Sequence, residues 1–254
     1  MYLIPLLIII ALTLAYTFGF DFGYQYNDVN TNEILLAPSW AHYFGTDALG
    51  RDLFVRVIHG ARMSLSIALF TAFNAFVIGS TLGMIAGYRG GWLDEIIAKL
   101  IDFIYSLPDL LVLSIIALSL SRSTTGIVLG LAFINWMDVA RLVRAETKRL
   151  KQEEFIQASR LIGLNPLQIM TRHLLPNTMP SIIVALSFTV PRAILSESTL
   201  SFIGLGISPP DTSCGTLAGD AWQYLRTDSH LIFFPALMIF LTVFSFNYLG
   251  DKLR

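Results

Sequence analysis

The sequence predicts an all-α membrane protein with six transmembrane helices, and composition is the first reason. Of its 254 residues, 54% are hydrophobic and only 14% are charged, and the mean hydropathy is +0.64. A soluble domain carries about 25% charged residues. The single cysteine, Cys214, excludes an internal disulfide and a cysteine-based metal cage. We therefore expect an apolar helical bundle without covalent cross-links.

The second reason is a set of long apolar runs. A spanning helix needs about 20 predominantly apolar residues. Runs of this kind cover residues 3–20, 64–88, 101–121, 124–140, 181–203 and 231–249. The first has no basic flank ahead of it, so we interpret it as a retained span and not as a cleaved signal peptide. The third contains Pro108, which neighbouring helices can accommodate.

Basic residues concentrate between the fourth and fifth runs, and this distribution predicts the orientation. By the positive-inside rule, that loop is cytoplasmic. Six spans then place both termini on the cytoplasmic side. Arg51, Arg56 and Arg62 fall outside under this assignment, but most basic residues support it. Those of the loop are Arg141, Arg144, Lys148, Arg149, Lys151, Arg160 and Arg172.

The basic loop, defined here as residues 144–177, is predicted to contain two helices joined by a tight turn. In residues 151–162, Phe155, Ala158, Leu161 and Ile162 recur at three- and four-residue steps and share one face. Gly163 can adopt a positive φ and close this first helix.

A second short helix is predicted to follow the glycine. Asn165 is a good N-cap and Pro166 suits the first helical position. This helix should reach about residue 175 and stop at Pro176. It would leave exposed the apolar side chains of Leu164, Leu167 and Ile169. A soluble partner could bind them, or the loop could lie on the membrane surface as an amphipathic basic element.

A resemblance favours the docking interpretation. The letters QAS at 157–159, the glycine at 163 and HLLP at 173–176 resemble the EAA loop of bacterial ABC importer permeases. Gln157, Ser159 and His173 depart from the general motif, which has Glu, Ala and an aliphatic residue there. The resemblance implies that this loop couples the permease to an ATPase subunit. The residues it assigns to coupling are Phe155, Gln157, Ala158, Ser159, Leu161, Gly163, Leu164, Asn165, Pro166, Leu167, His173, Leu175 and Pro176.

The resemblance extends from about residue 44 to the C-terminus. Residues 44–52, 60–65, 195–206 and 246–251 are similar to segments of the dipeptide, oligopeptide and nickel permease branch. This implies a type I ABC importer (MetI-like) architecture in three parts. They are a first span with an outer loop (1–44), an outer interfacial helix (45–63), and a permease core of five spans with the coupling loop (64–254).

The same resemblance implies the function and the partners. The chain would carry dipeptides or oligopeptides across the cytoplasmic membrane, with nickel or another small solute as the alternative. It would pair with a homologous permease, forming a heterodimer, and with two ABC ATPase subunits and an extracytoplasmic substrate-binding protein. ATP and magnesium would bind to the ATPases, and no cofactor is expected on this chain.

Other classes of protein find less support in the residues. The chain has no phosphate-binding G-x-x-x-x-G-K-S/T segment, and none of its four histidines belongs to an H-E-x-x-H pair. An intramembrane protease could still assemble its site from distant helices. A secondary transporter would require internal repeats, and none is evident.

Ionisable residues within the apolar runs are expensive and therefore candidates for function. Arg192 and Glu197 lie inside the fifth run and are possible pore or interface residues. Because they are five residues apart, we expect Glu197 to find its partner on another helix or subunit. Asp138 and Arg141 are expected to pair at the end of the fourth run. Asp102 and Asp109 lie in the third.

The segment before the second run is predicted to be a separate interfacial helix. In residues 48–59, apolar side chains share one helical face and polar side chains share another. Asp52 and Arg56 are spaced to pair at i,i+4. In the last outer segment, Trp222 and Tyr224 suit either an aromatic belt or a recognition surface.

Overall fold

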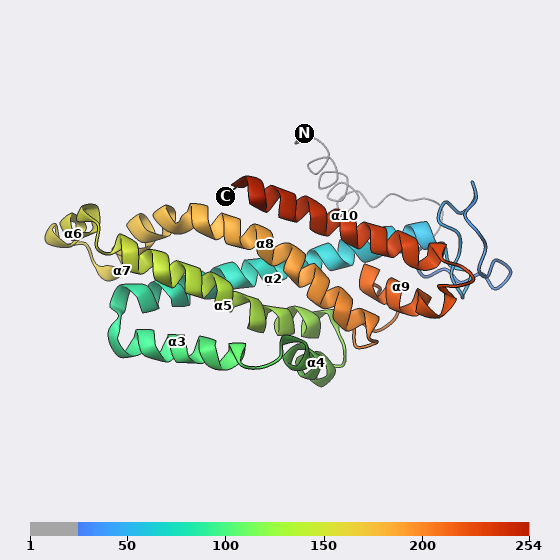
Figure 1. The fold of residues 1–254 in the computed structure, drawn as a ribbon, viewed down its shortest axis with the longest axis horizontal. Coiled ribbons are helices and arrows are strands. Elements are labelled where there is room, and N and C mark those ends of the chain that lie inside the picture. Colours follow the sequence, from blue (N-terminus) through green and yellow to red (C-terminus); the bar gives the residue numbers. More distant parts are fainter. Residues whose placement is uncertain (1–24, 254) are drawn as a thin grey trace.

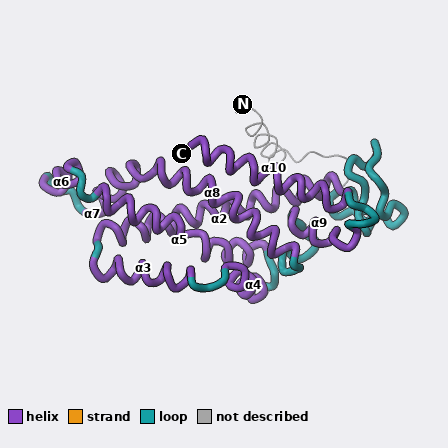
Figure 2. Tube along the Cα trace, in the orientation of Figure 1, coloured by secondary structure: helices purple, strands orange, loops and turns teal. Residues whose placement is uncertain are grey.

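The computed structural model describes residues 25–253, and the predicted first span lies outside these residues. Helices and loops make up the described part, with one isolated bridge between Thr46 and Asp52. The long helices run along one common axis (Figures 1 and 2). The basic loop lies at one end of the bundle. Helix α9 (Cys214–Ala221) and the irregular segment 25–52 lie at the other, which we call the α9 end.

Helix α2 (Leu53–Arg89) contains the predicted second span and also most of the predicted interfacial helix. The prediction of a separate helix at 45–63 was therefore wrong. Gly60, the one helix-weakening residue between the two, does not break α2. A side chain there would lie 2.9 Å from the carbonyl carbon of Ser213, so this glycine permits α9 to approach α2.

The predicted Asp52–Arg56 pair is replaced by other partners. Asp52 is the N-cap of α2 and accepts the backbone N–H of Val55. Its second oxygen lies 2.8 Å from Nδ1 of His42. Arg56 instead forms an ion pair with Asp47 at 3.3 Å.

The predicted third span is two helices and not one. Helix α3 (Gly91–Tyr105) and α4 (Asp109–Ser119) meet at an angle of 88°. Proline has no backbone N–H and disfavours helical geometry in the residue before it. Residues 106–108 therefore separate the two helices, with Pro108 as the N-cap of α4, and the neighbouring helices do not keep the span continuous. Helix α3 begins at Gly91, ten residues before the predicted start of the third span.

Helix α5 (Thr124–Leu150) has Ser123 as its N-cap, whose side chain accepts the N–H of Gly126. It continues beyond the predicted fourth span into the basic loop. There the loop forms α6 (Glu154–Leu161) and the short α7 (Pro166–Ile169).

The predicted stop at Pro176 was wrong. After α7, a π-helical turn η1 (Met170–Leu174) leads directly into α8 (Leu175–Phe202), so residues Pro166–Phe202 form one continuous helical rod. In η1 the N–H of Leu175 reaches the carbonyl of Met170, five residues back. This wider turn accommodates Pro176 at the start of α8 without ending the helix.

The chain then forms α9, the 3-10 turn η2 (Trp222–Tyr224) and α10 (His230–Leu253). Four described helices are long and apolar enough to cross a membrane, and a fifth span results if α3 and α4 are counted together. Five of the six predicted spans thus have counterparts among the described residues, the third in bent form.

The central packing is that of α2 on α5, the most extensive contact in the bundle. Gly79, Gly83 and Gly87 follow one another at four-residue steps along α2. A Cβ at Gly79 would lie 2.7 Å from the carbonyl oxygen of Trp136, and one at Gly83 would lie 2.6 Å from that of Ala140. The two backbones therefore touch directly, as small residues allow in membrane helices.

Candidate functional site

The first part of the candidate site is α6, which buries one face and exposes the other. Ile156 is fully buried and Ser159 nearly so, whereas Leu161 is 89% exposed and the next residue, Ile162, is 77% exposed. Phe155 is also exposed. The predicted helix was real but shorter than expected, because α5 extends to Leu150 and a turn separates it from α6.

The turn that follows has the predicted geometry. Gly163 has φ +87°, a conformation that favours glycine, and open space surrounds the position of its missing Cβ. Asn165 accepts the N–H of Gln168 at 2.8 Å, and the Gln168 side chain accepts the N–H of Asn165 at 3.0 Å. This reciprocal capping box fixes the start of α7, with Pro166 as its first residue.

Most of the residues assigned to coupling are exposed. Leu164, His173 and Leu175 are half-buried and Ser159 is buried. The others are exposed, namely Phe155, Gln157, Ala158, Leu161, Gly163, Asn165, Pro166, Leu167 and Pro176.

Three apolar side chains that the assignment omitted attach the loop to the bundle. Ile156, Ile169 and Leu174 are fully buried and pack in a cluster with residues of α2, α5 and α8. Ile169 was predicted to be exposed, and that prediction was wrong. Which side chains of the loop are buried depends on how the loop packs against α2, α5 and α8. The spacing of apolar residues within the loop does not reveal this packing.

Glu197 is fully buried near the α9 end and is surrounded by hydroxyl groups. Ser64 of α2 donates to one carboxyl oxygen at 3.1 Å, and Ser201 of α8 donates to the other at 2.7 Å. Ser213, the N-cap of α9, lies 3.5 Å from the Ser201 hydroxyl. The partner expected on another helix is thus Ser64, and the group joins α2, α8 and the start of α9.

Arg192 belongs to a second polar group, which is partly exposed on the side of the bundle. It forms ion pairs with Asp138 of α5 and, at 3.2 Å, with Asp109 of α4. The hydroxyl of Tyr105 also donates to Asp138. The side chains of Arg192, Asp109 and Asp138 are each between two-fifths and one-half exposed, at 43%, 47% and 45%. The bend between α3 and α4 brings Asp109 within reach of Arg192.

The predicted pair of Asp138 and Arg141 was wrong. Arg141 instead lies 3.5 Å from Asp102 of α3, with its guanidinium over the Tyr105 ring. Spacing along one helix suggested the local pair, but Asp138 has cross-helix partners that sequence spacing does not show.

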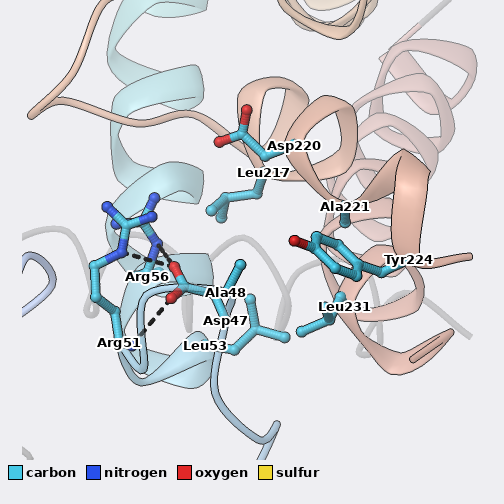
Figure 3. Close-up of a pocket in the computed structure, with 10 residues that line it drawn as sticks. All are labelled: Asp47, Ala48, Arg51, Leu53, Arg56, Leu217, Asp220, Ala221, Tyr224 and Leu231. Atoms are coloured by element: carbon cyan, nitrogen blue, oxygen red, sulfur yellow. Dashed lines mark hydrogen bonds and ion pairs between the residues drawn. The ribbon is translucent and has the colours of Figure 1, made fainter. Parts of the chain in front are cut away.

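At the α9 end, a small cavity of about 50 Å³ lies among α2, α9, η2 and the segment 25–52. Figure 3 shows Asp47 beside Arg51 and Arg56, with Asp220 and Tyr224 across the cavity. Asp47 pairs with Arg51 at 2.7 Å and with Arg56 at 3.3 Å. Arg56 is only 3% exposed. Both arginines thus have an acidic partner, and this corner of the α9 end is folded.

The described part of the chain contains no candidate metal site and no exposed cysteine. Among residues 25–253, no group of three or more His, Cys, Asp or Glu side chains could hold a metal ion. Cys214 is buried beneath α2, and burial raises the pKa of its thiol. Such a thiol is inert at neutral pH.

Long apolar helices that carry charged groups along their length, with a structured polar loop at one end, indicate a polytopic membrane protein, and such charged groups often mark the path of a solute or ion. Residues 79–253 match the family of binding-protein-dependent transport system inner membrane components. Because this match covers more than half of the chain, the chain belongs to that family and is a permease subunit, as predicted.

Curated relatives agree with this assignment. The dipeptide transport system permease protein DppC of Bacillus subtilis (strain 168) is 42% identical over 220 residues, which are 86% of this chain and 69% of the relative. The oligopeptide transport system permease protein OppC of the same organism is 39% identical, covering 89% of this chain and 75% of the relative. The glutathione transport system permease protein GsiD of Pectobacterium atrosepticum is 39% identical, covering 85% and 72%.

A solved structure confirms the predicted fold. A chain of the inward-facing MetNI methionine ABC transporter superposes with a TM-score of 0.63 at 20% identity, covering 77% of this chain and 93% of that chain. The expected MetI-like architecture is therefore correct.

Proposed function

We propose that the chain is a permease subunit of an ATP-driven importer of small peptides in the cytoplasmic membrane. The transported class follows from the relatives, which are named as dipeptide, oligopeptide and glutathione permeases. Nickel, or another small solute, remains the alternative. Uptake of a labelled dipeptide that is abolished by deleting this chain, and not reduced by excess nickel, would support peptide transport.

The basic loop is proposed to be the docking site for an ATPase subunit, and its exposed apolar residues are the observation that carries this assignment. Leu161, Ile162 and Leu167 are 89%, 77% and 65% exposed beside the Gly163 turn. They belong to α6, to the turn after it and to α7, which lie at one end of the bundle in Figure 1. Exposed apolar clusters rimmed by polar residues are typical of protein interaction sites.

This assignment orients the chain. The basic-loop end is cytoplasmic, so the C-terminus that follows α10 is cytoplasmic and the α9 end faces outward. The N-terminus is also cytoplasmic if residues 3–20 cross the membrane. The outward end is then available to a substrate-binding protein.

The proposed mechanism couples the loop to the charged group of Arg192, Asp109 and Asp138. ATP and magnesium bind to the partner ATPases, and this chain contributes the docking surface and half of the path. Nucleotide can shift the permease between two states only if the ATPase contacts the loop differently in each. Helices α5 and α8 leave the two sides of the loop and carry Asp138 and Arg192. Because these charges are partly exposed, we assign them to a water-filled path or to the contact with a second, homologous permease.

The docking assignment is tested by Leu161→Asp, with Leu161→Met as the matched control that keeps the apolar surface. We expect Leu161→Asp, and likewise Gly163→Pro, to abolish uptake and the co-purification of the ATPase while membrane insertion is unchanged. Leu161→Met should retain both. Normal uptake by Leu161→Asp at normal expression would refute docking through this surface.

A further inference from the structure

A wide cavity adjoins the proposed docking surface and extends it into the bundle. Its volume is about 790 Å³, which is within the range of binding pockets. One wall is the side of α6 that carries Gln157, Arg160 and Leu161, three residues at helical spacing. The other walls are the ends of α2 and α5 and the start of α3. Because Leu161 belongs to both, the cavity and the docking surface share an edge.

The lining of this cavity carries a net positive charge. Its charged residues are three cations and one carboxylate, namely Lys148, Lys151, Arg160 and Asp94. The carboxylate already has two cationic partners, because Lys148 Nζ lies 2.6 Å from one oxygen of Asp94 and Arg144 Nε lies 2.5 Å from the other. The lining therefore offers no carboxylate to Lys151 and Arg160.

Lys151 and Arg160 lie against an aromatic ring instead. Their cationic groups are 5.7 Å and 5.1 Å from the centre of the Tyr88 ring. Within residues 25–253, neither forms an ion pair. A ring face attracts a cation but leaves its N–H groups able to donate. Lys151 is half-buried and Arg160 is exposed, so water can accept these hydrogen bonds while the surface is free.

Docking of a partner changes this balance. A protein that covers Leu161 also removes water from the adjacent Arg160 and from the mouth of the cavity. Removing water from an unpaired cation costs free energy unless an acceptor of opposite charge replaces the water. Gln157 does not supply this charge, because its side chain is neutral and donates to the carbonyl of Gln152 at 3.0 Å. The negative charge must therefore come from the partner.

We propose that the partner ATPase inserts an acidic side chain into this cavity and pairs it with Lys151 and Arg160. The inference rests on the proposed docking of the ATPase at the Leu161 surface, and it adds the chemistry of the element that the ATPase presents there.

The acidic side chain gives the ATPase a second point of contact. Beyond the loop, it touches the ends of α2 and α5 and the start of α3. Asp94 joins α3 to α5 at this end through its ion pairs with Arg144 and Lys148. A displacement of the acidic side chain therefore reaches the bent unit of α3 and α4 without passing through α8.

The first test titrates the ATPase that co-purifies with this permease back onto the ATPase-free permease complex in lipid nanodiscs. We expect Lys151→Gln/Arg160→Gln to lower the affinity about tenfold, as for two partly exposed ion pairs. The affinity of this variant should also depend less on salt, because salt screens exposed ion pairs. Gln157→Glu places a carboxylate of this chain in the cavity, so it should weaken binding about threefold.

The second test detects the contact itself. A zero-length carbodiimide cross-linker joins a lysine amine to a carboxylate with loss of water. We expect it to join Nζ of Lys151 to an aspartate or glutamate of the ATPase, identified by mass spectrometry of the cross-linked peptides. Lys151→Arg keeps the charge, so it should retain the affinity and lose this cross-link.

The matched control is Arg149→Gln. Arg149 is a cation of the same loop, but it pairs with Glu146 and Glu153 and does not line the cavity. Its replacement should leave the affinity for the ATPase unchanged. An equal loss of affinity in this variant would show that only the general charge of the loop matters, and would overturn the proposal.

Three other outcomes would overturn the proposal and leave the docking assignment intact, provided that Leu161→Asp still abolishes binding. They are an unchanged affinity of the double glutamine variant, tighter binding by Gln157→Glu, and absence of the Lys151 cross-link. A lipid or a free anion in the cavity would give the last of these. Normal binding by Leu161→Asp would instead refute the docking assignment, and the proposal with it.

Discussion

Replacing Gly83 with alanine tests whether direct backbone contact holds α2 against α5. The added Cβ would lie 2.6 Å from the carbonyl oxygen of Ala140 and 3.0 Å from Cβ of Val143. Neither atom is the end of a flexible side chain, so one helix must move to relieve the collision. The same motion would loosen the neighbouring contacts of Gly79 and Gly87.

The magnitude follows from two opposing effects. Inserting a methyl group into a well-packed core costs about 1–3 kcal/mol. Alanine is a better helix former than glycine by up to about 1 kcal/mol, which offsets part of this cost. The expected net loss is about 1–2 kcal/mol. For a chain of this size, each kcal/mol lowers the melting temperature by about 2–4 °C.

The assay is thermal unfolding of the purified permease in one detergent, followed by intrinsic tryptophan fluorescence. The matched control is Thr81→Ala, an exposed position on the same helix whose hydroxyl donates only to the carbonyl of Val77. Its melting temperature should stay close to that of the wild type, because exposed substitutions usually change stability by less than about 0.5 kcal/mol. An unchanged or higher melting temperature for Gly83→Ala would show that the helices do not touch as described.

Three further predictions concern the polar groups. Glu197→Gln should leave the melting temperature nearly unchanged, because the amide can still form hydrogen bonds with both Ser64 and Ser201. Glu197→Ala should lower the melting temperature, because it removes two hydrogen bonds of about 0.6 kcal/mol each and leaves a cavity. Equal melting temperatures for the two variants would contradict this interpretation. Asn165→Ala removes the cap of α7 at a local cost of about 1 kcal/mol, so amide hydrogen exchange should accelerate at residues 167–169 but not in α10. Arg192→Gln should reduce uptake while the ATPase still co-purifies, because it removes the partner of Asp109 and Asp138 far from the loop; loss of co-purification would instead indicate a folding defect.

Local chemistry was readable from the sequence where neighbouring residues determine the structure. The positive φ of Gly163 and the Asn165 cap depend on residues within one turn of each position, and both predictions were confirmed. The apolar runs also predicted the helices of the bundle, since burial in lipid requires about 20 apolar residues whatever the topology.

The remaining features depend on contacts between distant segments. Whether Pro108 breaks the chain or only kinks it depends on what surrounds it, and the surroundings form only in the folded bundle. The partners of Arg192 come from α4 and α5, 83 and 54 residues away in sequence. The serines that donate hydrogen bonds to Glu197 could not be recognised in the sequence, because serines are also common on helix surfaces.

The continuity of the helix from Pro166 to Phe202 makes it a lever. Its 37 residues at 1.5 Å each span about 55 Å, whereas the hydrocarbon core is about 30 Å thick. The part before residue 181 therefore extends about 20 Å beyond the core. If the rod pivots about the Glu197 hydroxyl group, a rotation of about 10° moves its Pro166 tip by about 8 Å. A large displacement of the loop, such as the proposed ATPase docking would impose, would then reach the α9 end as a small change of angle, and a small rearrangement at the α9 end would be amplified at the loop.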